Sequence, residues 1–377
     1  MRKMKLIALK DVCKINMGQS PNSSSYNDYG DGMPFFQGNA DFGERYPITR
    51  VWCNTPTKIA QAEDILISVR APIGALNYAK EECCIGRGLA AITPDRNKVS
   101  QDFIYWALKG KKAELNDKGN GSTFKAISRK ILEETMIPDI NFEQQHKCAE
   151  NLEKIYGIIQ NRRKELLALD DLIKARFVEM FGSIHESTKY PYIAVKDLTD
   201  VISGGTPSRD RSEYWYNGTI PWVKTTELQN DVIKNVDEHI TESGLAGSSA
   251  KMVPIGTVLV AMYGQGKTRG MTAYLGIEAS TNQACACILP SEKIDSMFMW
   301  KYFELSYDKL RSLAQGAGQP NLNGNMIKNF QVLVPPIELQ KEFVSFVEQV
   351  DKSKVAVQKA LDETQTLFDS LMQEYFG

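Results

Sequence analysis

The stretch IALKDVCKINMGQSP at residues 7–21 occurs a second time in this chain, as IAVKDLTDVISGGTP at residues 193–207. The two copies share the pattern I-A-[LV]-K-D-[VL]-x-x-[IV]-x-x-G-x-[ST]-P without a gap. Self-similarity of this length is typical of chains built from copies of one structural unit. The sequence therefore predicts a tandem duplication, and the rest of the chain tests it.

Further segments continue the repeat in the same order. They are MPFFQG (33–38) with IPWVKT (220–225), DILISVR (64–70) with TVLVAMY (257–263), and GRGLAAITP (86–94) with NQACACILP (282–290). The offset between copies rises from 186 to 196 along these matches and settles at 195 from residue 103 onward. Surface loops tolerate insertions that core strands do not, so the drift indicates one scaffold with loops of different length.

The last part of each copy has the pattern of a long helix. Apolar residues recur at alternating spacings of three and four, which predicts a heptad seam over about four heptads. The predicted seam residues are Leu152, Ile155, Ile159, Leu166, Leu169 and Ile173 in the first copy and Val347, Val350, Val357, Leu361, Phe368 and Leu371 in the second. Arg162, Arg176, Lys354 and Thr364 interrupt the seam and are expected to set register. Asn141 and Gln144 predict a capping box at the first helix start.

Two arrangements of these helices are open from the pattern alone. Each could be buried against its own domain, or the two could pair with each other. We favour antiparallel pairing, because both helices carry the same stripe and both follow a globular part.

The parts that precede the helices, roughly 1–140 and 184–335, contain short β-rich runs broken by Gly, Pro, Asn and Ser. Each also has one short helical stretch, near 102–115 and 296–314. The fold class predicted is α+β. It comprises two tandem mixed α/β domains, each followed by a long helix, with the helices paired as an antiparallel coiled coil of pseudo-two-fold symmetry.

Composition excludes several classes of protein. The net charge is −1, with +3 on residues 1–188 and −4 on residues 189–377, so nucleic-acid binding could not rely on bulk basicity. No apolar run is long enough to predict a membrane span. Seven cysteines without a C-x-x-C pair, and only three histidines, give poor support for a zinc site. We expect a cytoplasmic protein with reduced, buried cysteines.

With two such copies, the chain resembles the specificity subunit of a type I restriction–modification system. The resemblance is carried by the opening motif that ends G-x-[ST]-P, the DILIS-type strand, TNQA at 281–284, the E-x-Q entry to each helix and the Phe-Gly endings. Each motif is weak alone, but their order, repeated twice, is specific and covers nearly the whole chain.

The resemblance implies a domain plan and a non-catalytic function. Residues 1–140 and 184–335 would be target recognition domains, each reading half of a split sequence in double-stranded DNA. Residues 141–183 and 336–377 would be spacer helices that set the unread gap and dock two methyltransferase subunits, through which restriction subunits join. S-adenosylmethionine, ATP and magnesium would belong to those partners, and no cofactor or metal is expected in this chain.

A phosphate-binding loop is the main rival interpretation. VLVAMYGQGKTRGM at 258–271 contains Ala261-x-x-x-x-Gly266-Lys267-Thr268, a relaxed form of that pattern. A true phosphate loop runs from a strand into a helix, whereas Thr268 is followed by two glycines and a β-like run. We therefore interpret the segment as a loop facing DNA. An NTPase, a methyltransferase and a coiled-coil protein without DNA binding stay as alternatives.

Candidate DNA contacts are polar or basic residues in loops next to the repeated strands, because such side chains distinguish bases by their donor and acceptor patterns. An ordinary loop function is the alternative for each. Phe35 and Trp222 are expected in the core. The candidates are Gln37, Arg70, Arg87, Lys125, Lys224, Tyr263, Lys267, Arg269, Gln283, Gln319 and Asn321.

Overall fold

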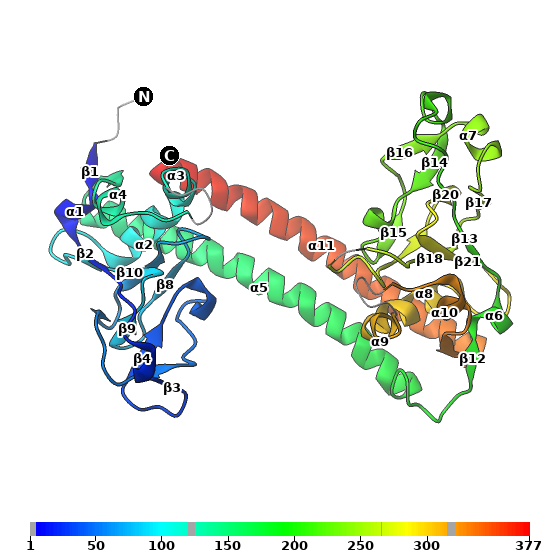
Figure 1. Ribbon diagram of the computed structural model, residues 1–377, viewed down its shortest axis with the longest axis horizontal. Coiled ribbons are helices and arrows are strands. Elements are labelled where there is room, and N and C mark those ends of the chain that lie inside the picture. The colour runs from blue at the N-terminus through cyan, green and yellow to red at the C-terminus, as the bar shows by residue number, and fades with distance from the viewer. Residues whose placement is uncertain (1–4, 120–124, 265, 315–320) are drawn as a thin grey trace. The chain divides into compact units, whose positions relative to one another are not determined.

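The computed structural model describes residues 5–119, 125–264, 266–314 and 321–377 of the 377-residue chain. The chain forms two compact units. Unit 1 holds residues 1–164 and 358–377, and unit 2 holds residues 165–357. Each unit combines one globular part with segments of both long helices (Figure 1).

Unit 1 is built on small sheets covered by helices. Strands β1 (Leu6–Ala8) and β11 (Met136–Pro138) form an antiparallel pair. An antiparallel sheet has the order β2-β10-β7-β8, with β2 (Cys13–Met17), β7 (Ile65–Ser68), β8 (Leu76–Tyr78) and β10 (Leu89–Pro94). A mixed sheet has the order β3-β5-β4-β9-β6, with β3 (Tyr26–Asn27), β4 (Met33–Phe36), β5 (Trp52–Cys53), β6 (Ile59–Ala60) and β9 (Cys83–Ile85). The helices are α1 (Leu9–Val12), α2 (Gln101–Gly110), α3 (Lys112–Asp117), α4 (Arg129–Glu133), and the short 3-10 turns Ser23–Ser25 and Asn39–Asp41.

Unit 2 repeats this plan. Strands β12 (Tyr192–Ala194) and β22 (Gln331–Leu333) form the antiparallel pair. One sheet has the order β13-β21-β18-β19-β15, with β13 (Val201–Ser203), β15 (Asp231–Ile233), β18 (Val258–Ala261), β19 (Thr272–Leu275) and β21 (Cys285–Ile288). The other has the order β16-β14-β20-β17, with β14 (Ile220–Val223), β16 (Glu238–Ile240), β17 (Met252–Val253) and β20 (Ala279–Thr281). The helices are α6 (Val195–Leu198), α7 (Glu242–Ala246), α8 (Ser296–Leu305), α9 (Tyr307–Ser312), α10 (Gly324–Lys328), and the 3-10 turns Ser212–Tyr214 and Thr225–Glu227.

The two long helices are α5 (Phe142–Phe181) and α11 (Ile337–Phe376), each of 40 residues. The capping box predicted for α5 is present: the Gln144 amide N–H donates to Asn141 Oδ1 at 2.9 Å, and the Asn141 amide N–H donates to Gln144 Oε1 at 3.3 Å. All twelve predicted seam residues are buried or half-buried.

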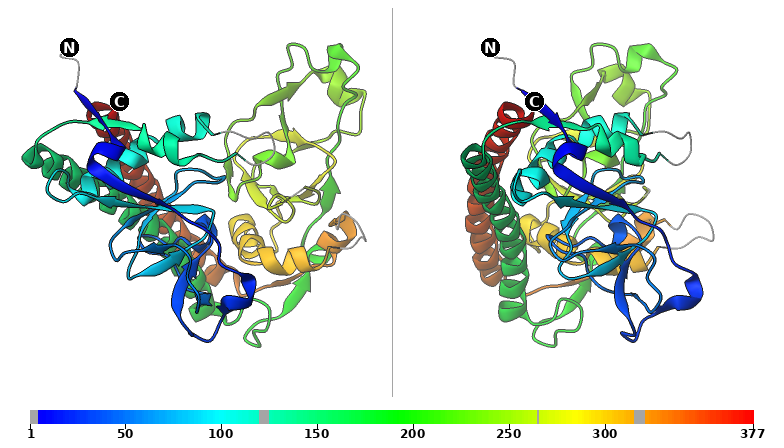
Figure 2. Two further views of the ribbon diagram at one scale, coloured as in Figure 1. Left: turned by 60° about the vertical axis from the view of Figure 1, so that its left-hand side comes forward. Right: turned by 90° about the vertical axis from the view of Figure 1, so that its left-hand side faces the viewer.

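Helices α5 and α11 pack side by side and antiparallel (Figures 1 and 2). In unit 1, the Asn151 amide bonds Tyr375 Oη at 3.3 Å, and further along α5 the ring of Tyr156 packs on Phe368. In unit 2, Asp170 pairs with Lys354 at 2.6 Å and Phe177 packs on Phe343. The α11 partner's number falls as the α5 number rises, so the predicted pairing is confirmed.

Charged residues that interrupt the seam link the two helices. Arg176 pairs with Glu342 at 2.9 Å, and Lys354 with Asp170 at 2.6 Å. Such pairs are specific to one register and add little stability at a solvent-facing position.

The ends of the long helices are exchanged between the two copies. Phe376, at the end of α11, packs on Phe103 of α2 in unit 1, with ring centroids 5.6 Å apart. Phe181, at the end of α5, packs on Phe298 of α8 in unit 2 at 5.5 Å. Phe181 is fully buried, and Phe376 is nearly so. The Phe-Gly endings therefore complete the core of the copy to which they do not belong in sequence.

The glutamine of each E-x-Q motif anchors the start of a long helix. Gln145 Oε1 accepts from the Ser100 amide at 2.7 Å, and its Nε2 donates to the Ile140 carbonyl at 2.8 Å. Gln340 makes the equivalent bonds to Asp295 and Pro335 at 2.9 and 2.7 Å. Both side chains are almost fully buried, where a polar group must find partners.

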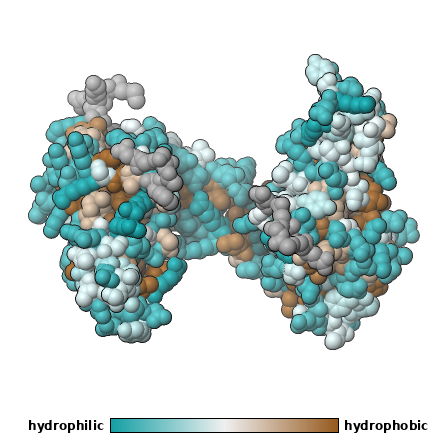
Figure 3. Space-filling view, viewed as in Figure 1, coloured by the Kyte–Doolittle hydropathy of each residue, from teal (hydrophilic) through white to brown (hydrophobic). Residues whose placement is uncertain are grey.

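All seven cysteines are buried and free, as expected. Burial raises the pKa of Cys13 and of Cys83 to about 12. Within the described ranges, no three His, Cys, Asp or Glu side chains gather as metal ligands would, and no described helix is long and apolar enough to span a membrane. Hydrophilic residues predominate on the face shown in Figure 3.

Candidate nucleic-acid interface

Gln37 and Arg87, predicted from distant parts of the sequence, lie side by side in unit 1. Gln37 follows β4, and Arg87 lies in the turn after β9. Because β4 and β9 are parallel, with Phe36 opposite Ile85, the chain leaves both strands at the same edge of the sheet. The Gly86 amide donates to the Phe36 carbonyl at 2.8 Å, and the Gly88 amide donates to the Gln37 carbonyl at 3.2 Å. Both candidate side chains are exposed.

Ser20 joins these two segments. Gln37 Nε2 donates to Ser20 Oγ at 3.0 Å, and the Arg87 amide donates to the same oxygen at 3.2 Å. Ser20 is the hydroxyl residue of the first G-x-[ST]-P motif. The motif predicted the repeat, but its function in holding the loop was missed from the sequence.

Close backbone approach requires small residues in this turn. A Cβ added at Gly88 would lie 2.4 Å from the Gln37 carbonyl oxygen, and one at Gly86 would lie 2.8 Å from Gln37 Oε1. A Cβ carbon does not come this close to an oxygen to which it is not bonded, so larger residues would displace Gln37. The glycines that flank Arg87 thus keep the two polar side chains adjacent.

Arg70 and Lys125 extend the same surface. The Val69 amide donates to the Gly88 carbonyl at 2.9 Å, and the Ala71 amide donates to the Lys125 carbonyl at 3.2 Å. Arg70 itself pairs with Ala126 in an isolated antiparallel bridge. The structure therefore brings all four unit 1 candidates onto segments that are hydrogen-bonded one to the next.

Unit 2 contains the equivalent arrangement around Lys224 and Gln283. β14 and β20 are parallel, with Val223 opposite Thr281, and the Asn282 amide donates to the Val223 carbonyl at 3.0 Å. Thr206, the counterpart of Ser20, donates its hydroxyl to Gln283 Oε1. The hydroxyl of the G-x-[ST]-P motif thus holds an exposed loop in both units.

Lys224 occupies the position that Gln37 holds in unit 1, but it forms ion pairs with two carboxylates. Its ammonium lies 3.0 Å from Glu238 and 3.6 Å from Asp237. A hydrogen bond to Glu238 is the main cause that raises the pKa of Lys224. Glu238 also pairs with Arg209 at 2.6 Å, and the Arg209 guanidinium lies 3.6 Å from the ring centroid of Trp215. Arg209 was not singled out from the sequence, because nothing local marks its partners.

The segment with the phosphate-loop pattern is a β-hairpin. It joins β18 to β19, which pair antiparallel, so no helix follows Thr268. Tyr307 Oη donates to the Lys267 carbonyl at 2.7 Å, and Arg311 Nη1 donates to the Arg269 carbonyl at 2.8 Å. Helix α9 therefore holds the hairpin by its backbone. Lys267 is exposed and Arg269 half-buried.

Tyr263 and Asn321 lie beside another backbone hydrogen bond that occurs in both units. The Leu322 amide donates to the Met262 carbonyl at 3.0 Å, as the Ile127 amide does to the Val69 carbonyl at 2.9 Å. Tyr263 is exposed and Asn321 half-buried. Gln319 lies outside the described residues.

Phe35 and Trp222 are buried at 5% and 2% exposure, so they belong to the core as predicted. Trp222 Nε1 donates to the Gly205 carbonyl at 2.9 Å, which satisfies its polar atom. These aromatic side chains support the loops and are not available for base stacking.

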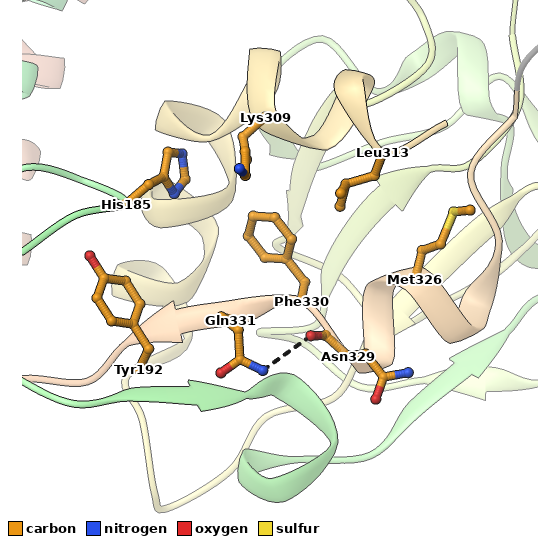
Figure 4. Close-up of a pocket in the computed structure, with 8 residues that line it drawn as sticks. All are labelled: His185, Tyr192, Lys309, Leu313, Met326, Asn329, Phe330 and Gln331. Carbon is orange, nitrogen blue, oxygen red and sulfur yellow. Dashed lines mark hydrogen bonds between the residues drawn. The ribbon is translucent and has the colours of Figure 1, made fainter. Parts of the chain in front are cut away.

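Unit 2 also has a pocket of about 490 Å³ between α9, α10 and the β12–β22 pair (Figure 4). The ring of Phe330 lies at its centre, and burial lowers the pKa of His185 at its edge. None of the candidate DNA contacts that the structure describes lines it. The lining residues are His185, Tyr192, Lys309, Leu313, Met326, Asn329, Phe330 and Gln331.

Comparison with known proteins gives one consistent result. The family model described as type I restriction modification DNA specificity domain matches residues 1–169 and 187–364. The chain is similar to the MjaX specificity subunit of Methanocaldococcus jannaschii, with 47% identity over 152 residues; the match covers 40% of this chain and 36% of that relative. It is 22% identical to the type I restriction enzyme MjaIX specificity subunit of the same organism, over 97% of this chain and 90% of that one.

Solved structures share the fold. The type I restriction–modification S subunit from M. genitalium superposes with a TM-score of 0.62 and 15% identity, covering 100% of this chain and 97% of that chain. A chain from a study of complex assembly and conformational transition of the type I system gives a TM-score of 0.61. At this identity the likeness concerns the fold alone.

Proposed function

Because this chain belongs to the family of type I restriction–modification DNA specificity domains, we propose that it is the DNA-reading, non-catalytic subunit of such a complex. The globular part of each unit reads one half of a two-part target in double-stranded DNA. The paired helices set the unread gap between the halves. The recognition domains are residues 1–140 and 184–335, and the spacer helices are residues 141–183 and 336–377.

One observation carries the proposal. An equivalent hydrogen-bonded arrangement of loops occurs in both units, but the polar side chains on it differ: Gln37 and Arg87 are exposed in one, and in the other Gln283 is exposed and Lys224 is half-buried and ion-paired. Amide and guanidinium groups distinguish base pairs in the major groove by their donors and acceptors. A common scaffold with different polar side chains suits a protein that reads two different short sequences.

Docking of two methyltransferase subunits on the long helices is part of the same proposal. Leu167 on α5 is 65% exposed, and Val355 on α11 is 71% exposed, although both helices bury a separate seam. Leu172 and Leu367 are about half exposed as well. Apolar side chains left outside a paired seam suit contact with a further protein.

In this proposal, the partner subunits supply positive charge for binding DNA and hold the cofactors. With a net charge of −1, strong attraction to phosphates must come from local patches and from partner subunits. S-adenosylmethionine, ATP and magnesium are assigned to the methyltransferase and restriction subunits. The restriction subunits join through the methyltransferase subunits.

The proposal is tested by expressing the chain with the methyltransferase subunit from the same genome and mapping methylated bases across a host genome. We expect methylation at one two-part sequence, and none when this chain is omitted. Methylation at a continuous site, or the same pattern without this chain, would contradict the proposal. ATP hydrolysis by the isolated chain would favour the rival nucleotide-binding function.

A further inference from the structure

The two units present different chemistry at equivalent positions, although their scaffolds match. Two positions are defined in each unit. The first follows the parallel strand β4 or β14 and holds Gln37 or Lys224. The second lies in the turn after β9 or β20 and holds Arg87 or Gln283. The backbone bonds that fix the pair, from Gly86 to Phe36 and from Asn282 to Val223, are the same.

A glutamine is held by the hydroxyl of the G-x-[ST]-P motif in both units, but at opposite positions. Ser20 bonds Gln37 at the first position, and Thr206 bonds Gln283 at the second. A side-chain amide fixed at one end loses little entropy when it meets a base edge. Each unit thus has one preoriented amide, in a different place.

The basic residue of each pair differs in availability. In unit 2, Lys224 is paired with Glu238 and Asp237, so its charge is neutralised within the unit. In unit 1, Arg87 is exposed, and none of the ion pairs formed within the described ranges includes it. Its backbone amide is held by Ser20, which fixes the turn while the guanidinium extends from it.

We infer that the second position selects a different base pair in each half of the target, Arg87 a guanine and Gln283 an adenine. An arginine guanidinium bonds O6 and N7 of guanine, and a glutamine amide bonds N6 and N7 of adenine. The first position of unit 1 adds the Gln37 amide, whereas that of unit 2 is closed by its carboxylates. This inference rests on the proposed function and adds which residues carry the difference between the two half-sites.

The test exchanges the two residues in the complete complex with the methyltransferase. The variants are Arg87→Gln and Gln283→Arg, with Lys80→Gln as a matched control. Lys80 is an exposed residue that follows β8, at the end of the β2-β10-β7-β8 sheet opposite to the one where Arg87 precedes β10. DNA libraries randomised one base pair at a time report methylation at each position of both halves. The three substituted side chains are exposed. Thermal melting followed by circular dichroism checks that each variant folds.

Arg87→Gln is expected to lower the preference for guanine at one position of one half by roughly ten- to a hundredfold, with the other half unchanged. Gln283→Arg should change one position of the other half, and Lys80→Gln neither. A uniform loss across all sequences, or no change at any position, overturns the inference while the two-part target still stands. A wild-type complex that reads no two-part target would instead contradict the proposed function.

Discussion

At the scale of single residues, the candidate surface depends on contacts that no local pattern contains. The sequence could predict that Gln37, Arg87 and Gln283 lie in loops beside repeated strands, and the structure places them so. It could not predict that Glu238 and Asp237 pair with Lys224, because these residues come together only when β16 lies against β14. Burial of Phe35 and Trp222 was predicted from the sequence and is confirmed.

Gly88 provides the test at this scale. Gly88→Ala places a Cβ 2.4 Å from the Gln37 carbonyl oxygen, so the backbone must shift. We expect the free energy of unfolding in urea to fall by about 1–3 kcal/mol, as for other overpacked sites. Gly38→Ala is the matched control, since a Cβ there meets nothing within 4 Å. Equal effects of the two substitutions would show that the close approach is not what requires glycine.

At the scale of elements, the repeat predicts where strands and helices fall better than it predicts what stabilises them. The E-x-Q motif marks the start of each long helix, and the structure gives its physical cause in a buried glutamine that accepts from the amide of the residue just before α2 or α8. The equivalent positions 109 on α2 and 304 on α8 nevertheless hold side chains of opposite charge with different contacts. Lys109 lies 3.6 Å from the ring centroid of Tyr156, whereas the counterpart Glu304 is paired with Lys301 at 2.9 Å.

Gln340→Leu should strongly destabilise the chain. The substitution leaves the Asp295 amide and the Pro335 carbonyl without partners in a buried site. Each unpaired buried group costs about 1–3 kcal/mol, which a urea titration detects. Gln358→Leu serves as the control, because that exposed glutamine bonds only the nearby Asp362. A small effect at Gln340 would mean that water replaces the lost bonds.

Lys109 should make stability depend on pH in alkaline solution. Burial lowers the pKa of Lys109 from 10.5 to about 8, so the folded chain loses this proton at lower pH than the unfolded chain. The unfolded chain then binds more protons between pH 8 and about 10.5, and the contribution of Lys109 to the free energy of unfolding rises across that range. Lys109→Met should remove this rise and stabilise the protein at pH 7.

The measurement is urea denaturation of Lys109→Met and of the unsubstituted chain at several pH values. Lys14→Met, at an exposed position on β2, should leave the pH profile as it was. If Lys109→Met and the unsubstituted chain have parallel profiles, the ammonium is solvated in the folded protein.

At the scale of the whole molecule, the duplication and the antiparallel helices could be predicted, but the exchange of their ends could not. The sequence placed Phe181 and Phe376 at matching ends of two copies. Only the structure shows Phe181 in the core with Phe298, and Phe376 in the core with Phe103. The heptad pattern specifies that the helices pair, and it contains no information on which globular part each end contacts.

The exchange predicts that a chain cut once between the copies stays together. Residues 184–191 link α5 to β12, and a protease site inserted there leaves each fragment with a helix that contributes to both units. We expect the cut protein to elute from gel filtration as one species and to separate only in denaturant. A control cut in the loop between α7 and β17 should likewise retain both fragments. Separation of the linker-cut fragments in native buffer would refute the prediction.

The exchanged helix ends also bear on how the protein is made. The core that begins with β1 includes Phe376, which lies 273 positions after its ring partner Phe103. Contacts this distant form late, since the intervening chain must first be available. During synthesis the amino-terminal core therefore cannot gain this contact to Phe103 until the chain has been translated as far as Phe376.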